Sequence, residues 1–203
     1  YARLLSVFPG KDLFDILRIT FGRIGGKFLS LVYIWYAFHL GALVLTNFGK
    51  FISTSELPET PQIVSVAGMG LLCVWGVKEG IELMGRWAKL FIVTLVGIVV
   101  LTSILLIPKF AICNILPILN SDTGPFINGV FSAFAFPFAE TVVFVMAFGS
   151  FRTSKSPYKI FSVALLVSAV VLIIAALRNI LVMGEDMLEG VYFPSHAVTG
   201  RVD

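Results

Sequence analysis

The chain has 203 residues, of which 58% are hydrophobic and 13% are charged, and its formal net charge is +3. An ordinary globular chain carries about 25% charged residues, so a water-soluble fold of this size would lack the polar groups that cover a surface. The composition excludes a disordered chain, a nucleic-acid-binding domain and a secreted disulfide scaffold. It predicts an integral membrane protein.

A short amphipathic helix is expected first, over residues 12–25. Four apolar residues recur there at helical spacing: Leu13, Phe14, Leu17 and Phe21. Pro9-Gly10 before the segment and Gly25-Gly26 at its end are start and stop signals. A helix lying in the membrane interface fits this pattern, and an ordinary loop helix is the alternative.

Membrane-spanning helices account for most of the remaining chain. A spanning helix needs about 20 mostly apolar residues, and five windows meet or approach this length. The expected spans are residues 28–51, 61–80, 88–108, 126–151 and 160–183. No stretch shows the alternation that a transmembrane strand requires. We therefore predict an all-α fold with five transmembrane helices in a single transmembrane domain, residues 1–203.

The first span carries one titratable residue, His39, among several aromatic side chains. A histidine inside a membrane can relay protons or contact a ligand. It can equally be a neutral ring that is hydrogen-bonded to a neighbouring helix. The aromatic neighbours are more typical of packing than of a cation-binding cage.

The fourth span contains a proline and an acid near its middle, Pro137 and Glu140. Proline removes a backbone donor, and a carboxylate at this depth must face protein, water or substrate. The span also has small residues that allow close approach: Gly129, Ser132, Ala133, Ala135 and Ala139. The pattern predicts a discontinuous helix whose freed backbone groups bind a small polar ligand. The alternative is a proline kink with Glu140 hydrogen-bonded into the freed backbone.

Arg178 stands near the end of the fifth span, about 27 Å along the helix from Ile160 at 1.5 Å per residue. At that depth we expect its side chain to snorkel to the far interface.

The basic residues predict the orientation in the membrane. Of the 15 Lys and Arg residues, 11 precede the first span or lie in, or at the adjoining span ends of, the second-to-third and fourth-to-fifth connections. By the positive-inside rule this side is cytoplasmic, which places residues 1–27 in the cytoplasm.

The sequence contains no constellation for catalysis or metal binding. Its two cysteines, Cys73 and Cys113, are far apart and form no CxxC motif. A nucleophile–base pair, a phosphate-binding loop and a metal-ligand cluster are all missing from it. We expect no enzymatic activity, no cofactor and no metal.

Three groups of motifs, in this order, carry a family resemblance. The first comprises Phe8-Pro9-Gly10-Lys11-Asp12-Leu13 and Gly25-Gly26-Lys27, and the second comprises Gly80-Ile81-Glu82 and Gly85-Arg86. The third comprises Leu116-Pro117-Ile118-Leu119, Gly124-Pro125-Phe126 and Phe136-Pro137-Phe138-Ala139-Glu140. Over nearly its whole length the chain resembles the spore-germination permeases. These are the GerAB-like B subunits of nutrient-germinant receptors, in the amino acid–polyamine–organocation superfamily.

The resemblance implies a LeuT-like fold of ten helices in two inverted repeats, of which this chain would cover about helices three to seven. The fourth span then corresponds to helix six, which is broken and faces the substrate in that superfamily. The implied substrate-binding residues are Ser132, Phe134, Ala135, Phe136 and Phe138 at the break, and Tyr36, His39 and Leu40 in the first span. Glu140 is expected to act in ion or proton movement or in gating.

The resemblance also implies a function. The expected role is recognition of a small nutrient, such as an amino acid, in the inner membrane of the dormant spore, with the signal relayed to partner subunits. The expected partners are the small-molecule germinant, the lipid bilayer and the A and C receptor subunits, without nucleic acid. An H⁺- or Na⁺-coupled secondary transporter for amino acids or polyamines is the alternative, and a purely structural membrane subunit is a third possibility.

Overall fold

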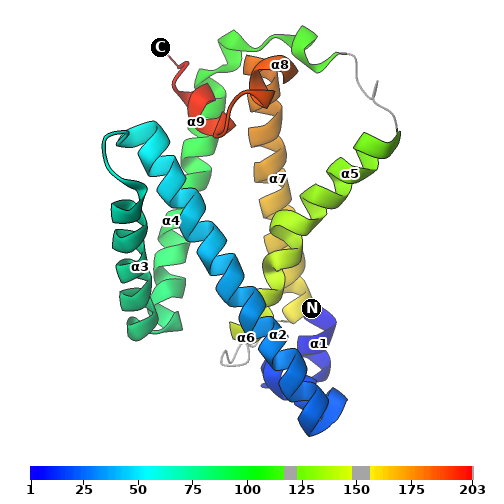
Figure 1. The fold of residues 1–203 in the computed structure, drawn as a ribbon. Coiled ribbons are helices and arrows are strands. Elements are labelled where there is room, and N and C mark those ends of the chain that lie inside the picture. The colour runs from blue at the N-terminus through cyan, green and yellow to red at the C-terminus, as the bar shows by residue number, and fades with distance from the viewer. Residues whose placement is uncertain (117–122, 148–155, 203) are drawn as a thin grey trace. The chain divides into compact units, whose positions relative to one another are not determined.

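The computed structural model describes residues 1–116, 123–147 and 156–202, and every regular element in these ranges is helical. The longer helices are α2 (Leu13–Phe51), α3 (Gln62–Glu79), α4 (Ile81–Leu105), α5 (Thr123–Ala133) and α7 (Pro157–Met183). The shorter ones are α1 (Ala2–Val7), α6 (Val142–Ala147), α8 (Glu185–Glu189) and α9 (Pro194–Thr199) (Figure 1). The π or 3₁₀ turns are η1 (Ile52–Glu56), η2 (Ile107–Lys109), η3 (Ile112–Ile115), η4 (Phe134–Phe138) and η5 (Ala139–Thr141). The motif residues 117–119 and the end of the predicted fourth span, residues 148–151, lie outside the described residues.

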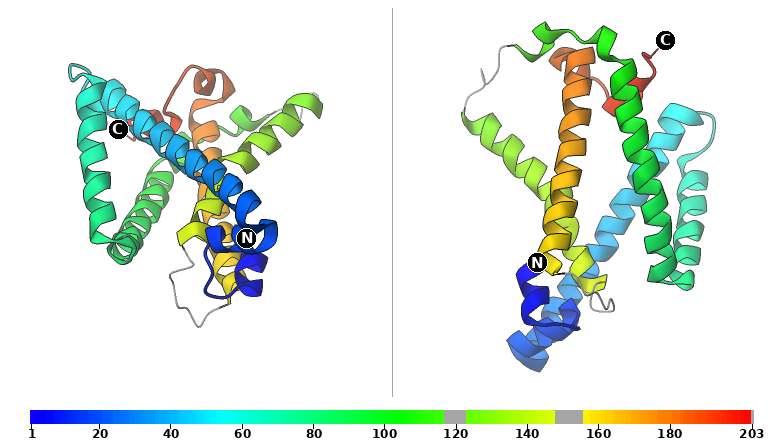
Figure 2. Two further views of the ribbon diagram at one scale, coloured as in Figure 1. Left: turned by 60° about the horizontal axis from the view of Figure 1, so that its bottom comes forward. Right: turned by 180° about the vertical axis from the view of Figure 1, so that it is seen from behind.

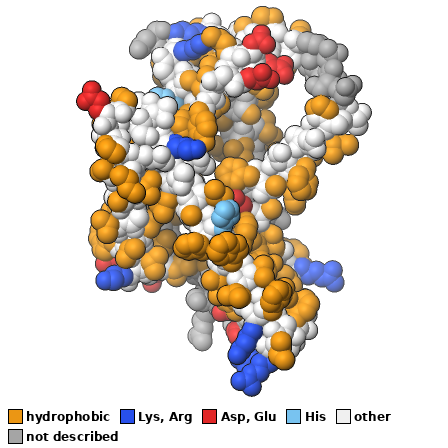
Figure 3. Space-filling view, in the orientation of Figure 1, with side chains coloured by type: hydrophobic (Ala, Val, Ile, Leu, Met, Phe, Trp, Pro, Cys, Tyr) orange, Lys and Arg blue, Asp and Glu red, His pale blue; other side chains and the backbone are white. Residues whose placement is uncertain are grey.

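Among the described residues, four helical segments are long and apolar enough to cross a membrane: Leu13–Glu56, Ile81–Leu105, Thr123–Ala147 and Pro157–Met183. In three of the four, no residue of the most apolar 18-residue stretch is buried. Figure 3 shows hydrophobic side chains on the surface over α2 and α3. Helices with such surfaces are stable against lipid, because all their backbone hydrogen bonds are internal. The chain is therefore an all-α integral membrane protein with several spans, as the sequence predicted.

The predicted second span, residues 61–80, corresponds to α3. This helix has 18 residues and is not among the four segments above. Its ends carry Gln62, Lys78 and Glu79, which are costly inside a bilayer. That α3 crosses the membrane stays a prediction.

The chain divides into two compact units. Unit 1 comprises Tyr1–Gly85 and Ala139–Ile160, and unit 2 comprises Arg86–Phe138 and Phe161–Asp203. In unit 1, α2 packs against α3 and α6, and η1 continues the end of α2 (Figure 2). The Gln62 side chain at the start of α3 donates from Nε2 to the Thr46 carbonyl oxygen at 3.2 Å. This bond ties α3 to the end of α2.

Helix α2 is broken near its beginning. Asp12 caps its first turn, since Oδ1 accepts from the Asp15 amide at 2.8 Å. Gly22 has φ 71° and ψ −173°, a backbone conformation that glycine adopts without steric cost. It separates a short helical segment, residues 13–21, from the long segment, residues 23–51. The sequence placed the end of the short helix at Gly25-Gly26, and the structure places it at Gly22.

In unit 2 a small cap closes the ends of α4 and α7. We define the cap as residues 106–116 and 181–202. Its buried core consists of Leu106, Met183 and Val198. The Ala111 amide donates to the Leu181 carbonyl oxygen at 3.0 Å, and the Lys109 ammonium donates to the Arg201 carbonyl oxygen. The cap thus joins the segment after α4 to the C-terminal segment.

Candidate functional site

The fourth span is interrupted between α5 and α6. Helix α5 ends at Ala133, the turns η4 and η5 follow, and α6 begins at Val142. Within η4 the Phe136 backbone is extended, with φ −130° and ψ 120°, and Pro137 has no N–H to donate. The helix is therefore discontinuous, as the sequence predicted. Pro137 therefore removes one helical donor at this point.

Five predicted substrate-binding residues lie at or next to the break, in unit 2: Ser132, Phe134, Ala135, Phe136 and Phe138. Phe134 and Phe136 are 62% and 63% exposed. Ser132 is exposed, and Ala135 and Phe138 are half-buried. These residues follow one another along the end of α5 and η4, and their role in binding stays a prediction.

The other three predicted binding residues, Tyr36, His39 and Leu40, lie on α2 in unit 1. Tyr36 and Leu40 are half-buried and one turn apart. His39 is exposed, and its ring stacks on that of Trp35 with 6.4 Å between centroids. Residues four apart share a helix face, so His39 lies with Trp35. Tyr36 and Leu40 are therefore neighbours along α2, and His39 differs from them in being exposed and stacked on Trp35.

Glu140 lies in η5, in unit 1, and is half-buried. Its carboxyl group is close enough to the Tyr36 hydroxyl for the two to interact electrostatically. The carbonyl oxygen of the preceding residue, Ala139, accepts a hydrogen bond from the Tyr1 hydroxyl at 3.2 Å. Partial burial, and then the nearby Tyr33, raises the pKa of the Tyr1 phenol above its ordinary value. A tyrosine phenol is protonated at neutral pH, so the Tyr1 hydroxyl can donate this bond.

Tyr1 and Tyr33 lie near this part of the chain and were not predicted as site residues. Tyr33 precedes Tyr36 by three residues, and this spacing places both phenols on one face of α2. The signal for Tyr33 was therefore present in the sequence. Tyr1 and Ala139 are 138 positions apart, and no local pattern links them.

A second polar cluster, in unit 2, surrounds Arg178 on α7. Arg178 is 3% exposed. Its Nη1 donates to Thr102 Oγ1 on α4 at 2.7 Å, and its Nη2 donates to Asn179 Oδ1 at 3.1 Å. Asn179 Nδ2 in turn donates to Ser195 Oγ at 3.0 Å. The prediction that Arg178 snorkels to the interface is wrong, because neutral oxygens inside the unit take the place of water.

The described residues offer no candidate metal centre, since no three His, Cys, Asp or Glu side chains gather among them. Both cysteines, Cys73 and Cys113, are exposed free thiols.

Comparison with known proteins identifies the family. The family model described as "Spore germination protein" matches residues 1–200. Spore germination protein KB of Bacillus subtilis (strain 168) is 29% identical over 197 residues, which are 96% of this chain and 53% of that protein. From the same organism, spore germination protein YndE is 24% identical over 94% of this chain and 51% of its own length. Putative spore germination protein YfkT is 22% identical over 98% of this chain and 54% of its own length.

The chain spans about half the length of these curated relatives. No solved structure matches it. Because the family model covers almost every residue, the chain belongs to the spore germination protein family.

Proposed function

We propose that this chain forms part of the membrane subunit of a spore germinant receptor. The subunit binds a small nutrient, an amino acid, in the spore inner membrane and passes the signal to A and C subunits. Membership of the spore germination protein family supports this role. The observation that carries the proposal is the interruption of the fourth span at Phe136.

The interruption supplies hydrogen-bonding groups that an intact helix would hide. Carbonyl groups at the end of α5 without a helical donor can accept from the ammonium group of an amino acid. The carboxyl end of a helix also favours a positive charge. Ala135 leaves room for a ligand to approach the backbone, and Phe134 and Phe136 offer exposed apolar surface for its side chain.

The test replaces Ala135 with leucine in the full-length protein. Ala135→Leu is expected to shift the germinant dose–response to higher concentration by roughly tenfold or more, because the larger side chain fills ligand space. The fall in optical density of a spore suspension measures the response. Ala164→Leu, at an exposed position of α7, is the matched control. An unchanged response to Ala135→Leu, with normal protein abundance, would place the nutrient elsewhere.

The predicted contact of Tyr36 with the nutrient is tested separately, in the same assay, with Tyr36→Ala. Its matched control is Tyr158→Ala, because Tyr158 is 49% exposed at the start of α7. A shift for Tyr36→Ala alone supports a contact between α2 and the nutrient. Equal responses of the two variants would remove Tyr36 from the proposed site.

Transport is the competing function, and the names of the three relatives refer to germination. Reconstitution of the full-length protein into proteoliposomes separates the two. A receptor subunit is expected to give no concentrative uptake of a labelled amino acid, whereas a coupled transporter accumulates it against a gradient.

A further inference from the structure

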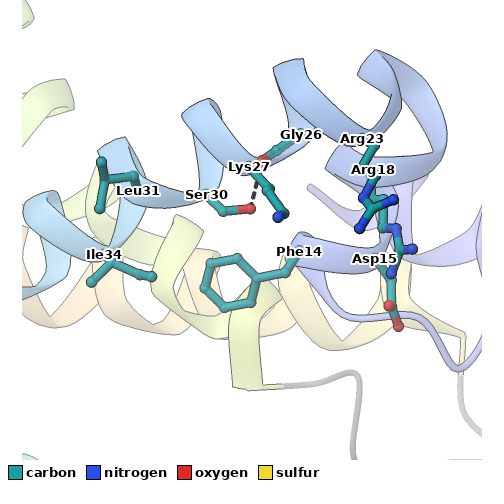
Figure 4. A pocket seen from close by; sticks show the side chains of 9 residues that line it. All are labelled: Phe14, Asp15, Arg18, Arg23, Gly26, Lys27, Ser30, Leu31 and Ile34. Carbon is teal, nitrogen blue, oxygen red and sulfur yellow. Dashed lines mark hydrogen bonds between the residues drawn. The ribbon is translucent and has the colours of Figure 1, made fainter.

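A cavity of about 450 Å³ lies in unit 1 where α2 begins (Figure 4). Its walls come from the two segments of α2 on either side of Gly22. Figure 4 shows the Arg18 and Arg23 side chains together at one end and Leu31 and Ile34 at the other. The cavity therefore has a charged end and an apolar end.

Close backbone packing holds the two segments together. A Cβ atom on Gly26 would lie 2.7 Å from the Arg18 Cα atom, a distance that only glycine permits. The positive φ of Gly22 reverses the chain between these residues. The cavity is thus set by the backbone of the short and long segments and does not depend on a flexible loop.

The charged end has an excess of positive charge. Arg18, Arg23 and Lys27 line the cavity with one carboxylate, Asp15. Across the described part of the chain, no carboxylate lies within 4.0 Å of any of the three cations. The long segment also starts beside them, and the first amides of a helix lack helical partners. These features suit an anion with several oxygen atoms.

The position of the cavity along the chain narrows the choice of anion. The cations end at Lys27, and residues 28–49 contain no Asp, Glu, Lys or Arg. The charged end therefore lies at headgroup depth, and Leu31 and Ile34 lie one to two turns deeper along the span. Figure 3 shows basic side chains gathered where α2 begins. A phospholipid has the same arrangement, with an anionic headgroup at the membrane surface and apolar chains deeper in the bilayer.

We propose that this cavity binds the phosphodiester headgroup of an anionic phospholipid. Arg18, Arg23 and Lys27 contact the phosphate oxygens, and Leu31 and Ile34 contact the first methylenes of an acyl chain. The site uses different residues from the nutrient site at the break, so either proposal can fail without the other.

Native mass spectrometry of the detergent-solubilised full-length protein, titrated with phosphatidylglycerol, tests the proposal. Phosphatidylglycerol is expected to bind more tightly than phosphatidylcholine with the same chains. The double variant Arg23→Gln/Lys27→Gln is expected to weaken phosphatidylglycerol binding roughly 30-fold, at about fivefold per cation. The matched control is Lys78→Gln/Lys89→Gln, which removes the same charge at exposed positions on the same predicted side. It is expected to leave the affinity unchanged.

Three outcomes would overturn the proposal. Equal losses in the two double variants would show that diffuse surface charge attracts the lipid. Displacement of the lipid by millimolar inorganic phosphate would show that a free phosphate group suffices. If Arg23→Gln/Lys27→Gln does not fold, each single variant is expected to lose about fivefold, and unchanged affinity in both would contradict the site. Arg23→Lys/Lys27→Arg, which keeps the charge, is expected to bind like the parent protein.

Discussion

At the residue scale, Arg178 shows how a charge is held inside this membrane protein. Its guanidinium group is 3% exposed and bonds to the Thr102 hydroxyl and the Asn179 amide oxygen. Removing an acceptor from a buried charge costs more than removing one from the surface, because water cannot replace it. The Thr102 hydroxyl should therefore contribute more to stability than the hydroxyl of Thr94, the other threonine of α4.

Thr102→Val tests this contribution. The substitution keeps the side-chain shape and removes one acceptor, so it is expected to lower the free energy of unfolding by about 1–3 kcal/mol. Thr94→Val is the matched control, because Thr94 is exposed on the same helix. Both hydroxyls donate to the carbonyl oxygen four residues earlier, Thr102 to Ile98 at 2.8 Å and Thr94 to Leu90 at 3.1 Å. Thermal unfolding of the full-length protein in detergent measures both. Equal losses would show that the bond to Arg178 is not the cause.

Glu140 is the second residue whose charge can be tested. Glu140→Gln keeps the shape and the oxygen acceptor but removes the proton that a carboxyl group can carry. If Glu140 moves a proton or gates an ion path, germination should be about tenfold slower or worse, with normal protein abundance. Germination rate and an immunoblot of isolated spore membranes measure the two quantities. Glu59→Gln, at an exposed position between α2 and α3, is the control. Loss of the Glu140→Gln protein from the membrane would point to a structural role.

At the element scale, the start of α2 depends on one close approach. Gly26→Val would place a side chain against the Arg18 backbone, where a Cβ atom already comes within 2.7 Å. Overpacking of this kind typically costs about 1–3 kcal/mol, so the variant should unfold at a lower temperature and lose affinity for phosphatidylglycerol. Gly41→Val is the matched control, since a Cβ atom there meets nothing within 4 Å. If the two variants behave alike, the packing of Gly26 on Arg18 does not determine the fold of this segment.

The two broken helices differ in how far the sequence predicts them. Pro137 predicts the interruption of the fourth span, because a proline in the interior of a helix removes a helical hydrogen bond. Gly22 gives no such signal, since a glycine inside an apolar helical pattern is compatible with a continuous helix. Its positive φ follows from the packing of Gly26 against Arg18, which is a contact between segments. From the sequence, this break was therefore expected at Gly25-Gly26 and not at Gly22.

At the scale of the whole molecule, the membrane class and the helical fold were predictable because they follow from composition and from the length of apolar runs. The polar clusters were not. The bonds from Tyr1 to Ala139 and from Arg178 to Thr102 join residues 138 and 76 positions apart. Each depends on how distant segments pack, and neither residue pair belongs to a periodic pattern. The position of Arg178 along its helix can be read from the sequence, but its contact with Thr102 cannot. The prediction for Arg178 was wrong for this reason.

The cap of unit 2 has a consequence for the order of events during synthesis. Lys109 bonds to the carbonyl of Arg201, 92 positions later, and Leu106 is buried against Met183 and Val198. At about 5–20 residues per second, the ribosome needs roughly 5 to 20 s between these positions. During that interval the end of α4 and the segment after it have no packing partner from the C-terminal segment. The cap is therefore among the last parts of this chain to fold, after α7 has been made.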